Sequence, residues 1–296
     1  MKKLSILLFT ILLLSMLAGC GKISGQDQIA ATTLPVYEFA SRLCEGSPLT
    51  VTRLVTEEVS CLHDYSLNVR QAKAAEAAET IVISGAGLET FLDDILTDER
   101  IIDASQDVAL IMPEEHRHDH EEKSGHEGHH HEEDPHIWLS PANAMIMVQN
   151  ICHGLSAEYP EYEPIFSQNL APLLEDLSAL QEYGADTLAN LSCRELITFH
   201  DGFSYLAAAF DLTILEAIEE ESGSEASAKE LIHMIEEVEH HKLPAVFTEK
   251  SGSVSAAGII SRETGAEVFS LDMAMAGNSY FDAMYHNINT LKEALQ

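Results

Sequence analysis

The sequence has little positive charge and few aromatic side chains. Only 16 of its 296 residues are lysine or arginine, against 49 aspartates and glutamates, which gives a formal net charge of -33. A chain with this charge repels nucleic acids and anionic lipids but attracts cations. We therefore expect no nucleic-acid partner and favour a metal cation as the ligand. The hydrophobic content of 46% is ordinary for a folded protein.

Long apolar runs are equally scarce, and the only one extends from Leu4 to Ala18 behind two lysines. It is too short for a comfortable membrane span and has the layout of a secretory signal. The LAGC motif ending at Cys20 resembles a bacterial lipobox, which implies cleavage before Cys20 and lipidation of its thiol; the alternative is an uncleaved anchor helix. We expect residues 1–19 to be a lipoprotein signal peptide and 20–28 a tether. The exported protein would then be held at the extracytoplasmic face of the cell membrane.

Cysteine is also rare, with five in the chain. The four beyond Cys20 would face an oxidising compartment, where four cysteines allow three disulfide pairings. The spacing selects none of these pairings, and buried free thiols fit equally well. The four residues are Cys44, Cys61, Cys152 and Cys193.

Short β-rich runs alternate with helical patterns on both sides of a polar insertion. This alternation predicts parallel sheets flanked by helices. We expect an α/β fold with two similar lobes, an N-terminal lobe at 29–159 and a C-terminal lobe at 192–296, joined by a long helical spine at 160–191. The expected strands are 29–34, 49–55, 80–84, 101–104, 194–199, 212–216, 245–248 and 267–271. The expected helices of the lobes are 36–43, 69–78, 88–96, 203–210, 226–242, 254–264 and one from Tyr280.

Four possible metal ligands follow expected strands. His63 and His136 lie in loops after the second and fourth strands, and His200 and Asp272 directly follow the first and last strands of the second lobe. Ligands of open α/β sheets bind outside the carboxyl ends of the strands, so two facing lobes would bring these residues to one interlobar cleft. Three imidazoles and a carboxylate match a four-coordinate zinc site better than a manganese site.

The polar insertion, residues 113–134, is crowded with histidine and acidic side chains. We interpret seven of its histidines as a flexible, low-affinity metal collector, with a solvated spacer as the alternative. They are His116, His118, His120, His126, His129, His130 and His131. The run from His126 to His130 also matches the H-E-x-x-H pattern of zinc proteases, which requires a helix. Gly125 and Gly128, with no apolar residues around them, give such a helix nothing to pack on.

Several segments resemble, in chain order, those of the ZnuA-like family, the zinc-binding proteins of ABC importers. They are TTLPVYEFA, HDYSLNVRQAKAAEAAETIVISGAGLE, the acidic-histidine loop, DPHIWLSP, TFHDGFSYLAAAF and PAVFTEKSGSV. The resemblance runs from about Thr32 to the C-terminus. It implies that the chain captures Zn²⁺ and delivers it to an ABC permease with its ATPase subunit.

The same resemblance implies His63, His136 and His200 as zinc ligands, since manganese-binding relatives tend to carry glutamate at the third position. It implies Asp272 as the fourth ligand. Relatives often have proline where this chain has Met273, and some zinc members have glutamate where it has Leu62. Water therefore stays open as an alternative to Asp272.

Other functions remain open at this stage. A lipid-anchored metal binder could serve as a surface adhesin or zinc buffer, and a manganese-importer protein is a further alternative. An extracellular zinc hydrolase would need an open ligand position and a general base, which the sequence does not show. We therefore expect a binding protein and not an enzyme.

Overall fold

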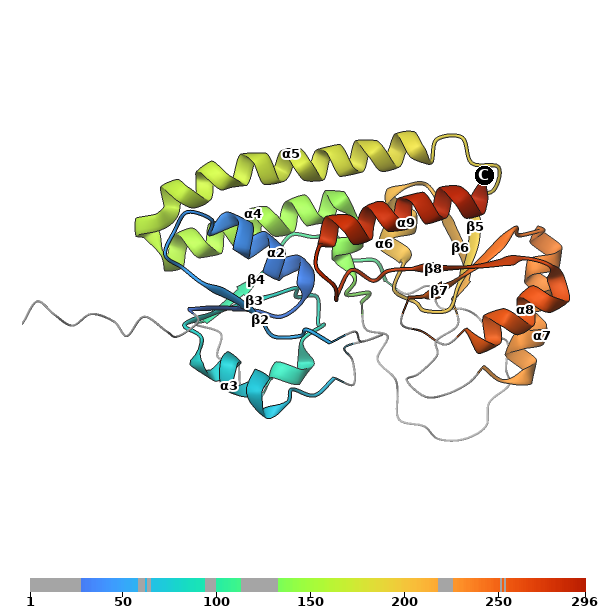
Figure 1. The fold of residues 1–296 in the computed structure, drawn as a ribbon, viewed down its shortest axis with the longest axis horizontal. Coiled ribbons are helices and arrows are strands. Elements are labelled where there is room, and N and C mark those ends of the chain that lie inside the picture. The colour runs from blue at the N-terminus through green and yellow to red at the C-terminus, as the bar shows by residue number, and fades with distance from the viewer. Residues whose placement is uncertain are drawn as a thin grey trace, which may run out of the picture.

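The computed structural model describes residues 28–57, 62, 65–93, 100–112, 133–217, 226–250, 252 and 254–296 (Figure 1). Among them are two sheets of four parallel strands each. The first, in the order β2-β1-β3-β4, contains β1 (Ile29–Ala31), β2 (Val51–Arg53), β3 (Thr80–Ile83) and β4 (Ile101–Asp103). The second, in the order β6-β5-β7-β8, contains β5 (Glu195–Thr198), β6 (Thr213–Ala217), β7 (Ala245–Glu249) and β8 (Glu267–Leu271). Both sheets follow the same strand order, which confirms the expected pair of similar α/β lobes.

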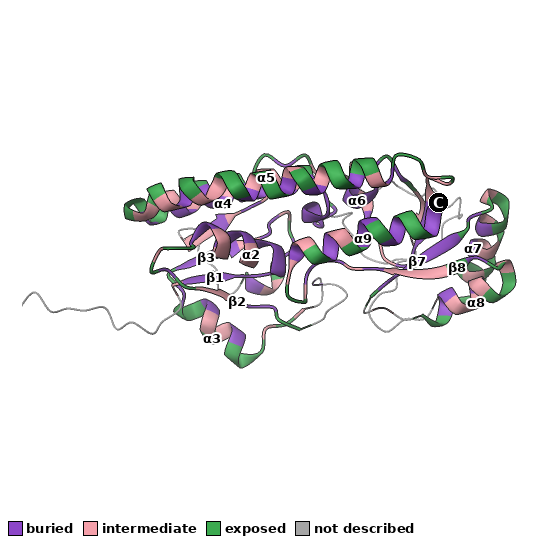
Figure 2. Ribbon diagram, turned by 45° about the horizontal axis from the view of Figure 1, so that its top comes forward, coloured by how far each residue is buried: buried purple, intermediate pink, exposed green. Residues whose placement is uncertain are grey.

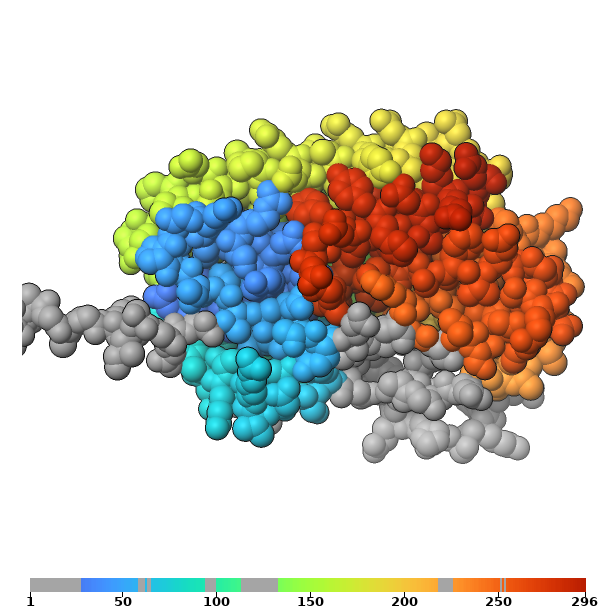
Figure 3. All heavy atoms as spheres, in the orientation of Figure 1, coloured from blue at the N-terminus to red at the C-terminus, as the bar shows by residue number. Residues whose placement is uncertain are grey.

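Helices cover the sheets and connect them. The first lobe carries α2 (Leu34–Leu43), α3 (Val69–Ala77) and α4 (Pro141–Glu158); the second carries α6 (Ser204–Ala209), α7 (Ala228–His241), α8 (Ser255–Thr264) and α9 (Tyr280–Leu295). The 25-residue helix α5 (Glu163–Thr187) runs along both lobes and packs on α4, α2 and α9 (Figure 1, Figure 3). The described residues also form three short 3-10 turns: η1 (Thr90–Leu92), η3 (Ile137–Leu139) and η4 (Pro160–Tyr162).

Local sequence signals explain where several helices begin. Asn68 and Gln71 form a capping box at α3, and Ser227 and Glu230 form one at α7. Each box satisfies backbone N–H groups that the first helical turn leaves unpaired. At α4, the Ser140 hydroxyl accepts an N–H of the first turn and is followed by Pro141, which suits the first helical position.

The helix expected at 88–96 is wrong for the described part of that segment, which contains only η1. Glu89 explains the difference. Its carboxylate accepts the backbone N–H groups of Ser84, at 2.7 Å, and Gly85, at 3.0 Å. These bonds tie the segment back to the end of β3, where Gly85 has a φ of +82°. Because the Glu89 carboxylate is bonded to this turn, the backbone around residue 89 follows a loop and not a helix.

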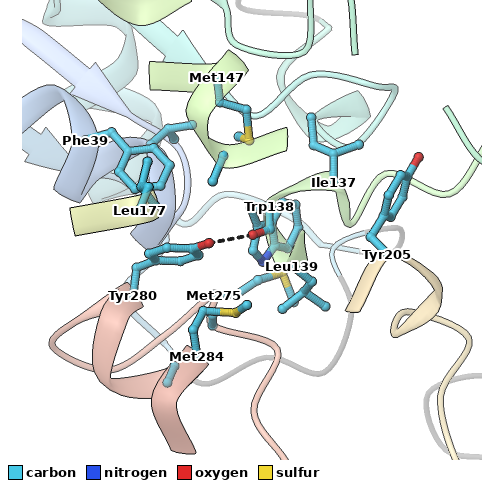
Figure 4. Close-up of a cluster of buried hydrophobic side chains, with 14 of the residues drawn as sticks. Phe39, Ile137, Trp138, Leu139, Met147, Leu177, Tyr205, Met275, Tyr280 and Met284 are labelled. Carbon is cyan, nitrogen blue, oxygen red and sulfur yellow. Dashed lines mark hydrogen bonds between the residues drawn. The ribbon is translucent and has the colours of Figure 1, made fainter. Parts of the chain in front are cut away.

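One hydrophobic core extends through both lobes. In it, the Trp138 indole N–H donates to the Met273 carbonyl at 2.8 Å. The Tyr280 hydroxyl donates to the Trp138 carbonyl, also at 2.8 Å (Figure 4). Trp138 comes from η3, before α4, whereas Tyr280 begins α9. Figure 2 shows the buried strands β1, β3 and β7 and the exposed outer faces of α5 and α9. The lobes therefore share packed side chains and hydrogen bonds from side chains to backbone carbonyls.

The cysteines with described positions are free thiols. Cys44 and Cys152 are buried and Cys193 is half-buried, whereas Cys61 lies outside the described residues. Burial raises the pKa of the Cys44 thiol to about 12. None of the described helices has the length and apolar character needed to cross a membrane.

Candidate metal centre

Two of the four expected ligands lie side by side. The imidazole rings of His136 and His200 have centroids 5.4 Å apart and are nearly perpendicular, at 83°. His136 immediately precedes η3 of the first lobe, and His200 follows β5 of the second. His136 is almost completely buried and the His200 side chain is 14% exposed. The fold therefore brings one histidine from each lobe into ring contact at a largely buried position.

A buried carboxylate orients His136. Asp134 Oδ1 lies 2.8 Å from His136 Nδ1 and also accepts the His136 backbone N–H at 2.9 Å. Because a carboxylate only accepts, Nδ1 carries the shared proton and Nε2 keeps its lone pair. Among the described residues, the buried Nε2 of His136 has no hydrogen-bond partner. A buried nitrogen in this state is suited to binding a metal.

His200 has a similar neighbour. Its Nδ1 lies 3.3 Å from Oε1 of Glu249, whose side chain is only 2% exposed. Glu249 ends β7, which pairs in parallel with β5, so the two residues meet at the carboxyl ends of adjacent strands. This contact also directs Nδ1 to a carboxylate and leaves Nε2 on the other side of the ring.

Gly202 allows the chain to approach the His200 ring. A Cβ at this position would lie 2.8 Å from His200 Nε2 and 2.5 Å from the Met273 methyl carbon. Any larger residue would displace one of these groups. Met273 thus packs beside His200, which places the segment after β8 next to the paired rings.

Asp272, the expected fourth ligand, follows β8 and forms an ion pair with Lys250. Its Oδ2 forms an ion pair with Lys250 Nζ at 3.1 Å, while Oδ1 accepts the Ala274 N–H at 2.8 Å. The Asn287 amide of α9 fixes the Asp272 backbone, accepting its N–H and donating to its carbonyl, both at 2.7 Å. The Asp272 position is therefore rigid, and a metal would compete with Lys250 for the carboxylate.

The remaining expected sites lie outside the described residues. These are His63, the lipidation site Cys20 and the seven loop histidines His116, His118, His120, His126, His129, His130 and His131. Leu62, directly before His63, is fully buried in the shared core. Leu62 thus lies in the same core as Trp138.

Sequence reasoning missed the groups that surround the rings. The signal for Asp134 was present in the DPH motif, because an acceptor two residues before a histidine can cap its backbone and orient its ring. Tyr205 could not be found this way: its hydroxyl donates to the Asp134 carbonyl at 3.0 Å from α6, in the other lobe. The contacts of Glu249 and Lys250 with His200 and Asp272 depend on the strand order of the second sheet, which local sequence does not reveal.

A third buried carboxylate lies at the carboxyl end of the first sheet. Glu89 accepts the Thr32 hydroxyl at 2.7 Å in addition to the two N–H groups after β3. Burial raises its pKa to about 7 although these three donors favour the charged form. Glu89 thus joins the ends of β1 and β3.

Comparison with known proteins agrees with this architecture. The sequence profile of the family described as "ZnuA: Zinc-uptake complex component A periplasmic" matches residues 29–294. The zinc-binding lipoprotein AdcA of Streptococcus pneumoniae serotype 4 is 31% identical over an alignment 312 residues long, which includes 99% of this chain. The chain spans only 61% of that protein's length.

Solved structures show the same fold. The Zn(II)-bound ZnuA-like domain of Streptococcus pneumoniae AdcA superposes with a TM-score of 0.75 at 27% identity, covering 92% of this chain and 99% of that one. A crystal structure of ZnuA gives a TM-score of 0.76 at 26% identity, with 91% and 99% covered. The similarity therefore includes both lobes and the helical spine between them.

Proposed function

This chain belongs to the ZnuA family of zinc-uptake components, and we propose that it captures Zn²⁺ outside the cytoplasm for an ABC importer. It then delivers the ion to the membrane permease, which works with an ATPase subunit. The observation that carries this proposal is the pair of buried rings, His136 and His200, each facing a carboxylate through Nδ1. Metal-binding histidines in proteins are commonly held in this way.

In the proposed site, His136 and His200 bind the cation through Nε2. His63 supplies a third imidazole, and Asp272 supplies an oxygen after releasing Lys250. This ligand set has the nitrogen-rich composition that suits zinc. With four protein ligands, no coordination position is left for a reacting water, so the site binds its cargo and performs no hydrolysis.

Release requires opening of the cleft. A nanomolar dissociation constant corresponds to about 12 kcal/mol, so the ion leaves rapidly only when one or two ligand bonds are broken. Because His136 and His200 belong to different lobes, a small separation of the lobes removes one of them. Docking on the permease would drive this separation. The shared core around Trp138 and Tyr280 limits its extent.

The acidic-histidine loop and the N-terminus complete the proposal. The histidines in 113–134 collect zinc loosely near the cleft, helped by the negative charge of the chain. Lipidated Cys20 keeps the protein at the extracytoplasmic membrane surface, close to its permease.

The proposal is tested by a zinc titration in competition with a fluorescent chelator. We expect His200→Ala to lose the tight equivalent, whereas His286→Ala, at an exposed position on α9, retains it. Unchanged tight binding by His200→Ala would overturn the site. Deleting residues 116–131 should preserve the tight equivalent and remove several loose ones.

Zinc uptake by cells separates transport from the alternatives. We expect cells without the chain to accumulate less zinc at low external concentration, and the parent chain to restore uptake. A surface adhesin or buffer would leave uptake unchanged. Restoration by His200→Ala would contradict the proposed role of the cleft.

A further inference from the structure

The last turn of α7 carries a second group of metal-binding side chains. Glu237, His240 and His241 each offer one ligand atom, and these atoms all lie within 4.8 Å of one another. The group belongs to the second lobe and contains none of the residues proposed for the cleft. It is half-exposed to exposed, so a cation could reach it directly from solvent.

The spacing of two of these groups suits a zinc ion. His241 Nε2 lies 3.5 Å from Glu237 Oε2. Two ligand atoms of a tetrahedral zinc, with bonds of about 2.0–2.1 Å, are separated by roughly 3.4 Å. The His240 ring lies 4.8 Å from the His241 ring, centroid to centroid. Because His240 is exposed at the helix end, its side chain can rotate to close the remaining distance.

Glu195 supports His241 from behind. Its Oε2 lies 3.0 Å from His241 Nδ1, on the opposite edge of the ring from Glu237. The Nδ1 edge of the His241 ring is therefore directed to Glu195, and its Nε2 edge to Glu237. This carboxylate–histidine arrangement orients metal ligands in many proteins and increases their basicity. The same type of contact occurs at His136 and His200.

The position on the helix also favours a cation. Helix α7 spans Ala228–His241, so both histidines lie in its last turn. The backbone carbonyls at a helix C-terminus carry partial negative charge, and Glu195 and Glu237 add two carboxylates.

The cluster is remote from the cleft. Glu195 begins β5, whereas His200 lies beyond its end. The four residues of β5 span about 10 Å of extended chain, and His200 lies two residues further on, so the two groups lie at opposite ends of this strand. They cannot share an ion.

We propose that Glu237, His240 and His241 form a second divalent-cation site, suited to zinc and independent of the interlobar cleft. Its nitrogen and oxygen donors fit Zn²⁺, with copper and nickel as chemical competitors. Three protein ligands leave at least one coordination position for water. The site therefore exchanges its ion more readily than the cleft.

A count of bound zinc tests this proposal on the full chain. In equilibrium dialysis at zinc concentrations high enough to fill both the cleft and the α7 site, the double variant His240→Ala/His241→Ala should bind about one equivalent less than the parent. The control is His153→Ala/His286→Ala, which removes two exposed histidines from α4 and α9. Contributions from other parts of the chain cancel in this comparison. Equal losses in both double variants would overturn the proposal.

Anomalous diffraction at the zinc edge locates the ion. Crystals of the full chain soaked in zinc should show one peak in the cleft and another within bonding distance of His241 Nε2. A filled cleft with no peak at α7 would overturn the second site without affecting the proposed importer function. Glu195→Gln retains all three ligands and should weaken this site roughly tenfold while leaving the cleft unchanged.

Discussion

The His136 and His200 rings lie 5.4 Å apart, and the Nδ1 edge of each faces a buried carboxylate. The contacts differ in origin. Asp134 is bound to the backbone N–H of His136 and belongs to the same loop, whereas Glu249 reaches His200 from a neighbouring strand. One histidine is thus oriented by local geometry and the other by sheet topology. The following variants test how these and other contacts contribute to binding and stability.

Replacing Asp134 with asparagine should weaken zinc binding by about 10–100-fold, because the amide no longer favours a fixed, basic His136 ring. Competition titration with a chelator measures the change. Glu133→Gln is the matched control: it removes the same charge from the adjacent, exposed position and should stay near the parent affinity. Similar losses in both variants would indicate an effect of net charge and contradict the positioning role of Asp134.

Lys250 and Asp272 distinguish the two possibilities for the fourth ligand. If the Asp272 carboxylate binds the ion, zinc displaces Lys250 from Oδ2, and Lys250→Gln should raise the affinity by up to about fivefold, the effect of an exposed ion pair. Asp272→Asn should lower the affinity. Calorimetry on both variants measures these opposite changes. An affinity unaffected by either substitution would identify water as the fourth ligand.

The Tyr280 hydroxyl should contribute to stability through the core shared by the lobes. Tyr280→Phe leaves the buried Trp138 carbonyl without its donor and should lower the free energy of unfolding by about 1–3 kcal/mol. Urea denaturation measures this loss. Tyr183→Phe removes a hydroxyl bonded to Asn289 at the surface and should change stability by less than about 0.5 kcal/mol. Equal effects would show that the interlobe bond has no special contribution.

Glu89 should make the stability depend on pH. Since burial raises its pKa from 4.5 to about 7, the folded protein keeps this proton to higher pH than the unfolded chain. Its contribution to the free energy of unfolding therefore falls as pH rises from about 4.5 to about 7, by up to roughly 3 kcal/mol. Glu89→Gln should abolish this contribution, so the stability of the variant relative to the parent increases over that range.

Urea denaturation at a series of pH values measures the Glu89 effect. Glu76→Gln, which removes an exposed carboxylate from α3, is the charge-matched control. A stability difference between Glu89→Gln and the parent that does not change with pH would show that the folded protein holds Glu89 ionised throughout.

Much of the fold followed from local patterns. The eight strands of the described residues were all expected near their observed positions, because short β-branched runs between helical patterns are typical of parallel sheets. The helix expected at 88–96 was wrong because Glu89 bonds to the end of β3, a contact that periodicity does not detect. Hydrophobic pattern indicates which residues are buried, but not which buried carboxylate binds which backbone group.

The sequence by itself determined the two-lobed α/β architecture, the cation preference implied by its charge, and the placement of His136 and His200 after the ordered elements of different lobes. These properties depend on composition and on short-range periodicity. Only the tertiary structure decided that Glu249 faces His200 and that Lys250 forms an ion pair with Asp272. It also decided that the Tyr205 and Tyr280 hydroxyls bind the segment around His136 from the opposite lobe. These contacts depend on strand order and lobe packing, which arise from interactions between residues far apart in the chain.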